Sequence, residues 1–486
     1  MELAFCYLND MRYPLLSLRK RIGWAVLFLT GAGPLTPGLA QGPHEILLLA
    51  NSRSELSMSV AKEYARLRRV PAANLIVLDI PLKDGRAPNA MTPEAFTEQI
   101  WNPARQSAER GGIAEHILAW VYAPDFPLRI ASDPPVSLTG ATFVRNRIPD
   151  SDTVKRGLYA NPLFAGPMRG SGRQRLSRSL DMARLLAGDA MPLPAMMLGI
   201  AGPQANTEQE ILAALRRGAA SDGTRPSGTV LFVTGEDIRA RERAWQFEGA
   251  VRELRERNIR AEILDTFPRN RDGILGLMAG AARLDTAGAG QFLPGAMADH
   301  LTSFAAAFDA DNQTRLTAWI RAGATLSSGT VTEPYALWQK FPHARFFVHY
   351  AAGCTALESF SQSVRDPLQL LLAGDPLARP WAADARLRLE AVRRGPEPHT
   401  LRVELALRAA VHLHFPTVQF LLDGHPLRDM DEIKADPDPA RKADEQRRVF
   451  LVRTGPLERR RYTLRAIAIG AGSVRQQIFD EQTVAL

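Results

Sequence analysis

The chain has 486 residues, of which 45% are hydrophobic and 23% charged. This composition excludes a long disordered or low-complexity protein, and the length predicts two or three domains. The net charge is +8, but the Arg residues are scattered rather than gathered with aromatic residues, so we expect no nucleic-acid binding.

Residues 1–40 predict a secretory signal peptide. Basic residues 19–21 precede an apolar run, residues 22–29, that is too short to span a bilayer, and "PGLAQG" then offers small residues at Gly38 and Ala40. We therefore expect a mature chain that is periplasmic or secreted. The alternative is an uncleaved segment that anchors the chain and keeps it in peripheral contact with the membrane.

Cysteine use is sparse. Cys6 lies in the predicted signal segment, which leaves Cys354 as the lone thiol of the mature chain. The sequence has no disulfide framework, no Cys/His spacing for zinc and no glycine-rich nucleotide motif. We therefore expect neither a metal nor a cofactor.

Residues 41–382 predict an α/β domain. The first unit is a strand at 46–50, a helix at 60–67 and a strand at 75–78. Strands that alternate with helices favour a largely parallel sheet with helices on both faces, and the Pro- and Gly-rich stretch 132–192 predicts a long loop. The further strands are expected at 116–121, 196–200, 229–233, 261–264, 297–301 and 324–327, and the further helices at 93–101, 207–218, 241–255, 315–322, 346–351 and 357–363.

Residues 383–486 have a different pattern. Leu401, Val403, Leu405 and Leu407 alternate with polar residues, and similar short runs follow with turns between them. This period of two predicts a small antiparallel β-sandwich of the immunoglobulin-like kind.

Four polar stretches follow apolar runs of the α/β domain, and in a parallel sheet such stretches share the edge where ligands bind. They supply the candidate catalytic residues. The stretches are "DHLTSF" (299–304), "SSGTVTEPY" (327–335), "AGCTALESF" (352–360) and "LLLAGDPLARPW" (370–381).

The chain up to Trp381 resembles an uncharacterised family of exported bacterial proteins from genomes that carry the exosortase sorting system. The resemblance implies export and a role near cell-envelope or exopolysaccharide biology, with an envelope protein or a glycan as the partner. It rests on "LGIAGPQANTEQEILAALRRGAASDG", "FLPGAMADHLTSF", "AGATLSSGTVTEPY" and "LLLAGDPLARPW".

A more distant resemblance is to gingipain-type cysteine peptidases of the caspase-like fold, which also have a "GDP" element, here residues 374–376, and an added immunoglobulin-like domain. That family needs a His after one strand and a Cys after the next. In this chain the His position falls in residues 275–285, which hold no His, and the Cys position falls at Thr302 and Ser303.

The remaining catalytic hypothesis uses His300 as the base for Ser303 or Cys354, with Glu333 or Asp375 orienting the imidazole. The structural alternatives are that His300 bonds a loop carbonyl and Ser303 caps a helix beginning near Phe304. In the same way, Glu333 and Asp375 are alternatively turn or cap residues, and Cys354 is alternatively buried and inert.

Asn51, Ser52 and Ser54 follow the first strand, where backbone N–H groups can receive an anion.

Two functions therefore remain open. One is a degenerate hydrolase-fold module that binds or scaffolds. The other is an active, peptidase-like hydrolase.

Overall fold

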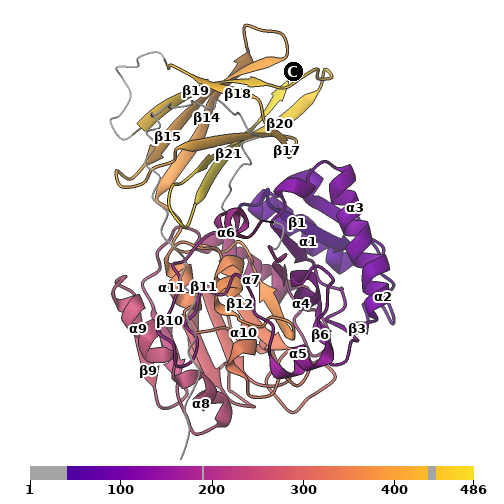
Figure 1. Cartoon of the computed structure of the whole chain (residues 1–486), viewed down its shortest axis with the longest axis vertical. Helices are drawn as coiled ribbons and strands as arrows, with labels where there is room; N and C mark the ends of the chain where they lie inside the picture. Colours follow the sequence, from indigo (N-terminus) through magenta and orange to yellow (C-terminus); the bar gives the residue numbers. More distant parts are fainter. Residues whose placement is uncertain (1–40, 189–190, 436–444, 486) are drawn as a thin grey trace, which may run out of the picture. The chain divides into compact units, whose positions relative to one another are not determined.

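The computed structural model describes residues 41–188, 191–435 and 445–485. The predicted signal peptide, residues 1–40, lies outside these ranges and stays a prediction. The described chain forms a mixed α/β region around a ten-stranded sheet, followed by two four-stranded antiparallel sheets (Figure 1).

The ten-stranded sheet has the order β2-β1-β4-β7-β13-β12-β11-β10-β8-β9. Strand β1 pairs in parallel with β2 and β4, β4 pairs in parallel with β7, and β8 to β12 pair in parallel with one another. Strand β13 pairs antiparallel to β12, with Gly374 opposite Leu326. The strands are β1 (Ile46–Asn51), β2 (Leu75–Leu78), β4 (Ala119–Tyr122), β7 (Ala195–Met197), β8 (Thr229–Val233), β9 (Arg260–Leu264), β10 (Arg271–Gly280), β11 (Gly290–Leu301), β12 (Leu326–Thr330) and β13 (Leu370–Gly374).

Helices cover both faces of this sheet. Leu231 of β8 belongs to an apolar cluster with Trp319, whereas the ring of Phe232 packs on Phe247 and Phe347. Successive strand residues point to opposite faces, so α10, which carries Trp319, lies opposite α9 and α11. The helices are α1 (Glu55–Arg68), α2 (Pro93–Ala95), α3 (Asn102–Arg110), α4 (Leu138–Phe143), α5 (Ser151–Arg156), α6 (Leu180–Ala187), α7 (Glu208–Ser221), α8 (Ile238–Ala244), α9 (Phe247–Arg255), α10 (Leu316–Arg321), α11 (Phe346–Ala351) and α12 (Ala356–Ser363).

Local sequence signals set several helix starts. The Ser54 hydroxyl accepts a hydrogen bond from the backbone N–H of Ser57 at the start of α1. Thr207 and Thr355 each begin a helix with a capping box, in which a Glu three residues later bonds back to the cap. Such caps satisfy N–H groups that have no partner within the helix.

The two four-stranded sheets have the orders β14-β15-β19-β18 and β17-β16-β20-β21. They share one apolar core, in which the rings of Phe420 and Phe450 lie 5.3 Å apart. The strands are β14 (Ala385–Arg394), β15 (Thr400–Ala409), β16 (Thr417–Leu422), β17 (His425–Leu427), β18 (Met430–Ile433), β19 (Glu445–Arg453), β20 (Arg461–Ile469) and β21 (Gln477–Ala485).

Several expected elements differ in the structure. The helix expected at 241–255 is two helices, α8 and α9, that meet at Trp245 and Gln246. The expected loop at 132–192 contains α4, α5 and α6 as well as strand β6 (Val136–Ser137), which pairs with β5 (Arg129–Ile130) beside β3 (Ala90–Met91). These helices are short, so their patterns are too brief to stand out against Pro and Gly.

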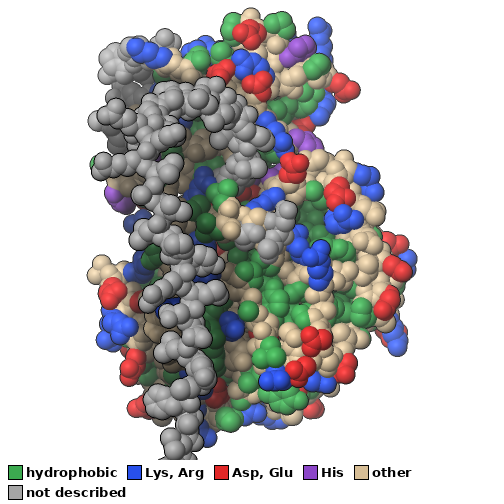
Figure 2. All heavy atoms as spheres, in the orientation of Figure 1, with side chains coloured by type: hydrophobic (Ala, Val, Ile, Leu, Met, Phe, Trp, Pro, Cys, Tyr) green, Lys and Arg blue, Asp and Glu red, His purple; other side chains and the backbone are tan. Residues whose placement is uncertain are grey.

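Positive and negative side chains are interspersed over the face drawn in Figure 2 rather than segregated. Within the described ranges, no helix is long and apolar enough to cross a membrane.

Candidate functional site

The loops that follow β4, β11 and β12 meet at one edge of the ten-stranded sheet, which we call the carboxyl edge. Arg129, shortly after β4, pairs with Asp309, after β11, at 2.6 Å. The same guanidinium donates to the backbone carbonyl of Val331, after β12, at 3.3 Å. Ligands of α/β sheets usually bind at this edge, so candidate catalytic residues are expected here.

His300 is buried at the end of β11, and both of its ring nitrogens are occupied. The Trp319 indole N–H donates to Nδ1 at 2.9 Å, and Nε2 lies 3.0 Å from the Thr314 carbonyl. This pattern fixes the neutral tautomer with its proton on Nε2. Burial lowers the pKa of His300 to about 4. The imidazole is therefore held as a neutral core residue and has no free nitrogen to accept a proton.

The neighbouring carboxylate points the other way. Asp299 forms a fully buried ion pair with Arg243 of α8, and it also accepts from the Ser328 hydroxyl. Since Asp299 and His300 are successive strand residues, they lie on opposite faces of the sheet. Asp299 therefore does not orient His300, as their closeness in sequence also indicates.

Ser303 and Glu333 are together at the carboxyl edge. The Ser303 hydroxyl donates to Glu333 Oε1 at 3.1 Å, and the same oxygen accepts from the Tyr335 backbone N–H at 2.8 Å. Ser303 lies in a turn and caps no helix, because the next helix begins only at Leu316. The pair braces two loops, and no imidazole completes it among the hydrogen bonds of the described residues.

Cys354 is buried just before α12. Its sulfur lies 3.6 Å from the Arg178 carbonyl and 3.5 Å from the Gln362 amide. Burial raises the pKa of the Cys354 thiol well above its ordinary value. Nearby His349 is also buried, and its Nδ1 lies 2.8 Å from the Ser177 hydroxyl. A neutral, enclosed thiol is a poor nucleophile.

Asp375 does not lie at the same edge of the sheet as His300, contrary to the sequence-based expectation. Because β13 runs antiparallel to β12, its end lies where β12 begins, at the edge opposite the carboxyl edge. There the buried Asp375 carboxylate pairs with Arg68 and accepts from the Tyr64 hydroxyl at 2.9 Å and from the Leu377 N–H at 3.0 Å. Asp375 therefore cannot support His300.

Cys354 lies on the same side as Asp375. Its neighbours Ala356 and Leu357 donate to the carbonyls of Ala378 and Pro376, which follow β13. The five candidate residues thus divide into a core histidine, a pair at the carboxyl edge and two residues at the opposite edge.

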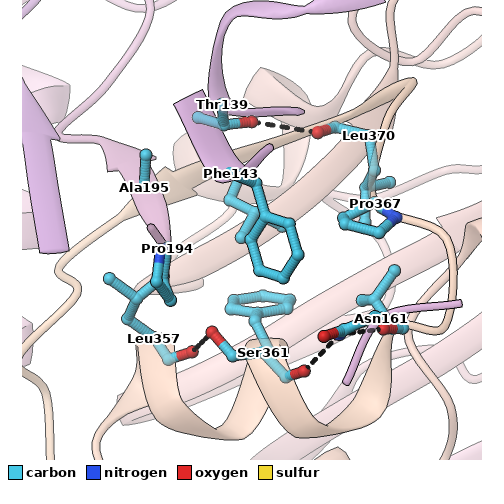
Figure 3. A pocket seen from close by; sticks show the side chains of 12 residues that line it. Thr139, Phe143, Asn161, Pro194, Ala195, Leu357, Ser361, Pro367 and Leu370 are labelled. Carbon is cyan, nitrogen blue, oxygen red and sulfur yellow. Dashed lines mark hydrogen bonds between the residues drawn. The ribbon is translucent and has the colours of Figure 1, made fainter. Parts of the chain in front are cut away.

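Two cavities near the large sheet differ sharply in size. The first is an apolar void of about 20 Å³ between α4, α12 and β13 (Figure 3). Its polar neighbours are already bonded: Thr139 to the Leu370 carbonyl, Ser361 to the Leu357 carbonyl and Asn161 to the Ser361 carbonyl. A void of this size has room for one water and for no ligand.

The second cavity is a cleft of about 530 Å³, which we call the Asp125 cleft. It lies near the carboxyl end of β1, whose two neighbours in the sheet are β2 on one side and β4 on the other. The chain goes first to β2 and later to β4, so this place is a topological switch point of the sheet. Its lining combines charged, amide and apolar side chains. Among the lining residues are Lys83, Asp84, Arg86, Asn89, Asp125, Phe126, Leu128, Met197, Ile200, Gln204 and Phe308.

Asp125 follows β4 with φ of +60°. The Ser54 hydroxyl donates to Asp125 Oδ2 at 2.5 Å, and the Asn51 amide donates to its backbone carbonyl at 3.0 Å. Arg86 lies 3.8 Å from Oδ1, and the Asp125 side chain is only 7% exposed. The carboxylate is thus fixed in place with one oxygen directed at an exposed guanidinium.

Part of the lining comes from a loop, residues 81–89, which we call the finger loop; its Arg86 is the residue near Asp125. Lys83 and Arg86 exchange two backbone hydrogen bonds across a turn formed by Asp84 and Gly85, both with positive φ. This turn geometry is typical of a two-residue hairpin. The finger loop therefore presents its charged side chains from a defined scaffold.

Residues 200–205 and Phe308 form another part of the lining. Arg315 donates to the Gln204 amide oxygen at 2.6 Å and lies 5.6 Å from the centre of the Phe308 ring. It therefore ties together two side chains that line the cleft.

The start of α1 does not offer the anion site that its sequence indicates. The N–H groups of Asn51, Ser52, Arg53 and Ser54 are all bonded within the protein. The Asp125 carboxylate itself bonds the Ser54 cap. A second anion there would be repelled.

No group of His, Cys, Asp and Glu residues suited to a metal ion is present in the described part of the chain.

Comparisons with known proteins give little. No family model matches the chain, and no curated protein matches it. Two solved structures of OgpA from Akkermansia muciniphila, the wild type and a catalytically inactive form with an O-glycopeptide substrate, are 9% and 10% identical. They cover 54% and 55% of this chain and 96% of the OgpA chains, with TM-scores of 0.17. We infer neither fold nor function from likenesses of this size.

Sequence reasoning found Asn51 and Ser54 but not the cleft beside them. Asp125 follows an apolar run directly, in "VYAPDF", and this was the available signal. The finger loop is polar and short, and nothing in its sequence places it over the end of β4.

Proposed function

We propose that the chain is an exported, non-catalytic binding module on a hydrolase-like α/β scaffold, periplasmic or secreted, which acts in the cell envelope. The proposal includes a caspase-like type for residues 41–382 and an immunoglobulin-like type for residues 383–486. The sheet order of the first part and the facing antiparallel sheets of the second support these finer assignments.

One observation carries the proposal. Both nitrogens of His300 are engaged within the core, by Trp319 and by the Thr314 carbonyl. A general base needs a free nitrogen within reach of the proton that it removes. Releasing one ring nitrogen of His300 would break a buried hydrogen bond and leave its partner unsatisfied, which costs roughly 1–3 kcal/mol.

The other candidate nucleophile supports the same conclusion. Attack by a cysteine needs the thiolate, and Cys354 lies in a site where burial raises its pKa and no cation pairs with it among its hydrogen bonds. The export and envelope parts of the proposal rest on the sequence of residues 1–40 and on the family resemblance.

Activity-based labelling tests the proposal. The mature protein is treated with a fluorophosphonate probe, which labels activated serines, beside a Ser303→Ala variant. Ser303 is half-buried in a turn, so this variant is expected to fold normally. We expect equal, background labelling of both proteins. Labelling of the wild type that disappears in Ser303→Ala and in His300→Gln would establish a serine hydrolase and overturn the proposal.

A further inference from the structure

We infer that the Asp125 cleft binds a small, neutral, hydroxyl-rich ligand of the saccharide class. This inference rests on the proposed binding function and assigns that function a place and a ligand chemistry. The cleft volume, about 530 Å³, lies within the range of small-molecule sites.

The charges of the cleft favour a neutral ligand. Lys83 and Arg86 supply two positive charges, and Asp84 and Asp125 supply two negative charges. The N-terminal end of α1, which would attract an anion, already has the Asp125 carboxylate bonded to its cap residue, Ser54. A cationic ligand would meet Arg86 at the approach to the same carboxylate. Neither ionic class is therefore favoured.

The polar groups of the cleft offer donors and acceptors side by side. Asp125 Oδ1 accepts only a loose interaction from Arg86, at 3.8 Å, so it retains capacity for a donor. Arg86, Lys83 and the amide of Asn89 supply donors from the finger loop. A sugar hydroxyl both donates and accepts, so adjacent hydroxyls can bridge a carboxylate and a guanidinium at once.

The apolar part of the lining suits a ring with C–H faces. The lining includes four buried apolar side chains, Phe126, Leu128, Met197 and Ile200, and the half-buried ring of Phe308. Ligand sites typically combine such apolar surface with a few fixed polar groups. A sugar ring presents hydroxyls at its perimeter and C–H groups on its faces, which matches this division.

An extended peptide fits less well. Peptides that bind at sheets usually add a strand to a free edge. Among the strands that lead into lining residues, β4 and β7 are interior strands with a neighbour on each side, whereas β2, which the finger loop follows, is an edge strand but has none of its own residues in the lining. The cleft therefore offers a peptide no exposed ladder of backbone groups.

Calorimetric titration of the mature protein tests the inference. The probes are maltose, cellobiose and N,N′-diacetylchitobiose, with the dipeptide Gly-Leu as a contrast of similar size. Three variants are compared with the wild type: Asp125→Asn, Arg86→Ala on the exposed finger loop, and Asp79→Asn. Asp79 is a matched control, since it pairs with Arg53, is 64% exposed and does not line the cleft.

We expect saturable binding of at least one disaccharide, weakened at least about tenfold in Asp125→Asn and in Arg86→Ala and unchanged in Asp79→Asn. Absence of binding to all three sugars overturns the inference, as does binding that survives both cleft substitutions. Binding of Gly-Leu alone overturns the ligand class.

Chromatography of the same mixtures separates this inference from the proposed function. Cleavage of a bound disaccharide that is lost in Asp125→Asn would support the cleft and overturn the non-catalytic proposal. If Asp125→Asn does not fold, as judged by its unfolding curve, Arg86→Ala decides alone.

Discussion

Replacing Asp299 by Asn removes one charge from an ion pair in which both side chains are 0% exposed. Removing one partner of a buried pair typically costs about 3–5 kcal/mol, because the other charge remains buried without compensation. Arg243 keeps the Ala279 and Pro342 carbonyls as acceptors, and Ser328 keeps an acceptor in the new amide. We therefore expect Asp299→Asn to lower the free energy of unfolding by about 3 kcal/mol, the lower end of that range.

Urea unfolding followed by circular dichroism measures this loss. At an m-value of about 3 kcal/mol/M, the midpoint would fall by about 1 M with the slope unchanged. The matched control is Glu262→Gln, which breaks the Arg271–Glu262 pair between strands of the same sheet. Its side chains are 43% and 40% exposed, so the expected loss is under about 1 kcal/mol.

A midpoint that falls no further in Asp299→Asn than in Glu262→Gln would show that the buried Arg243 charge is not costly when unpaired. A double variant, Arg243→Met with Asp299→Leu, checks the cause. Because it removes both charges, it should recover part of the stability lost in Asp299→Asn. A double variant as unstable as the single one would show that lost packing, not the uncompensated charge, dominates.

Three further predictions concern residues of the α/β part of the chain. His300 is neutral in the fold because burial lowers its pKa from 6.5 to about 4. Its stabilising contribution relative to His300→Gln is therefore present above pH 6.5 and should shrink by about 2–3 kcal/mol as the pH falls to about 4.5. Urea unfolding curves at the two pH values that show a constant difference between the two proteins would contradict this. Cys354 should resist iodoacetamide in the native protein and react fully in urea, as read by mass spectrometry, whereas rapid native labelling would place the thiol at the surface. Gly140→Ala should lower the free energy of unfolding by about 1–3 kcal/mol, because the added Cβ would lie 2.2 Å from the Leu368 carbonyl oxygen. The control is Gly249→Ala in α9, whose Cβ would meet nothing within 4 Å; in the same urea assay it should leave stability unchanged or raise it.

Hydrophobic patterning predicted much of the large sheet correctly. The runs that become β1 and β8 are almost entirely apolar, and strands buried on both faces require such runs. The helix start at Thr207 was likewise predicted, because capping is a local interaction. Short elements such as α5 and α6 were missed, since one or two helical turns carry too little periodicity.

The direction of β13 is a different kind of failure. The run Leu370–Gly374 is apolar at every position, so its pattern is the same whichever way it enters the sheet. Helices α11 and α12 precede it, and a helical connection normally returns the chain for a parallel strand. The antiparallel pairing with β12 therefore moved Asp375 to the edge opposite Ser303 and Glu333, which sequence order could not reveal.

Local spacing and composition were enough to predict the types of the main elements, the change of pattern after residue 382 and the residue types available for chemistry. What those residues do depends on contacts that form only when the chain is folded. Trp319 donates a hydrogen bond to His300 from 19 residues away along the chain, and Ser54 donates one to Asp125 from 71 residues away. Hydrogen bonds between such distant segments depend on how strands are ordered and directed, and no local pattern encodes that.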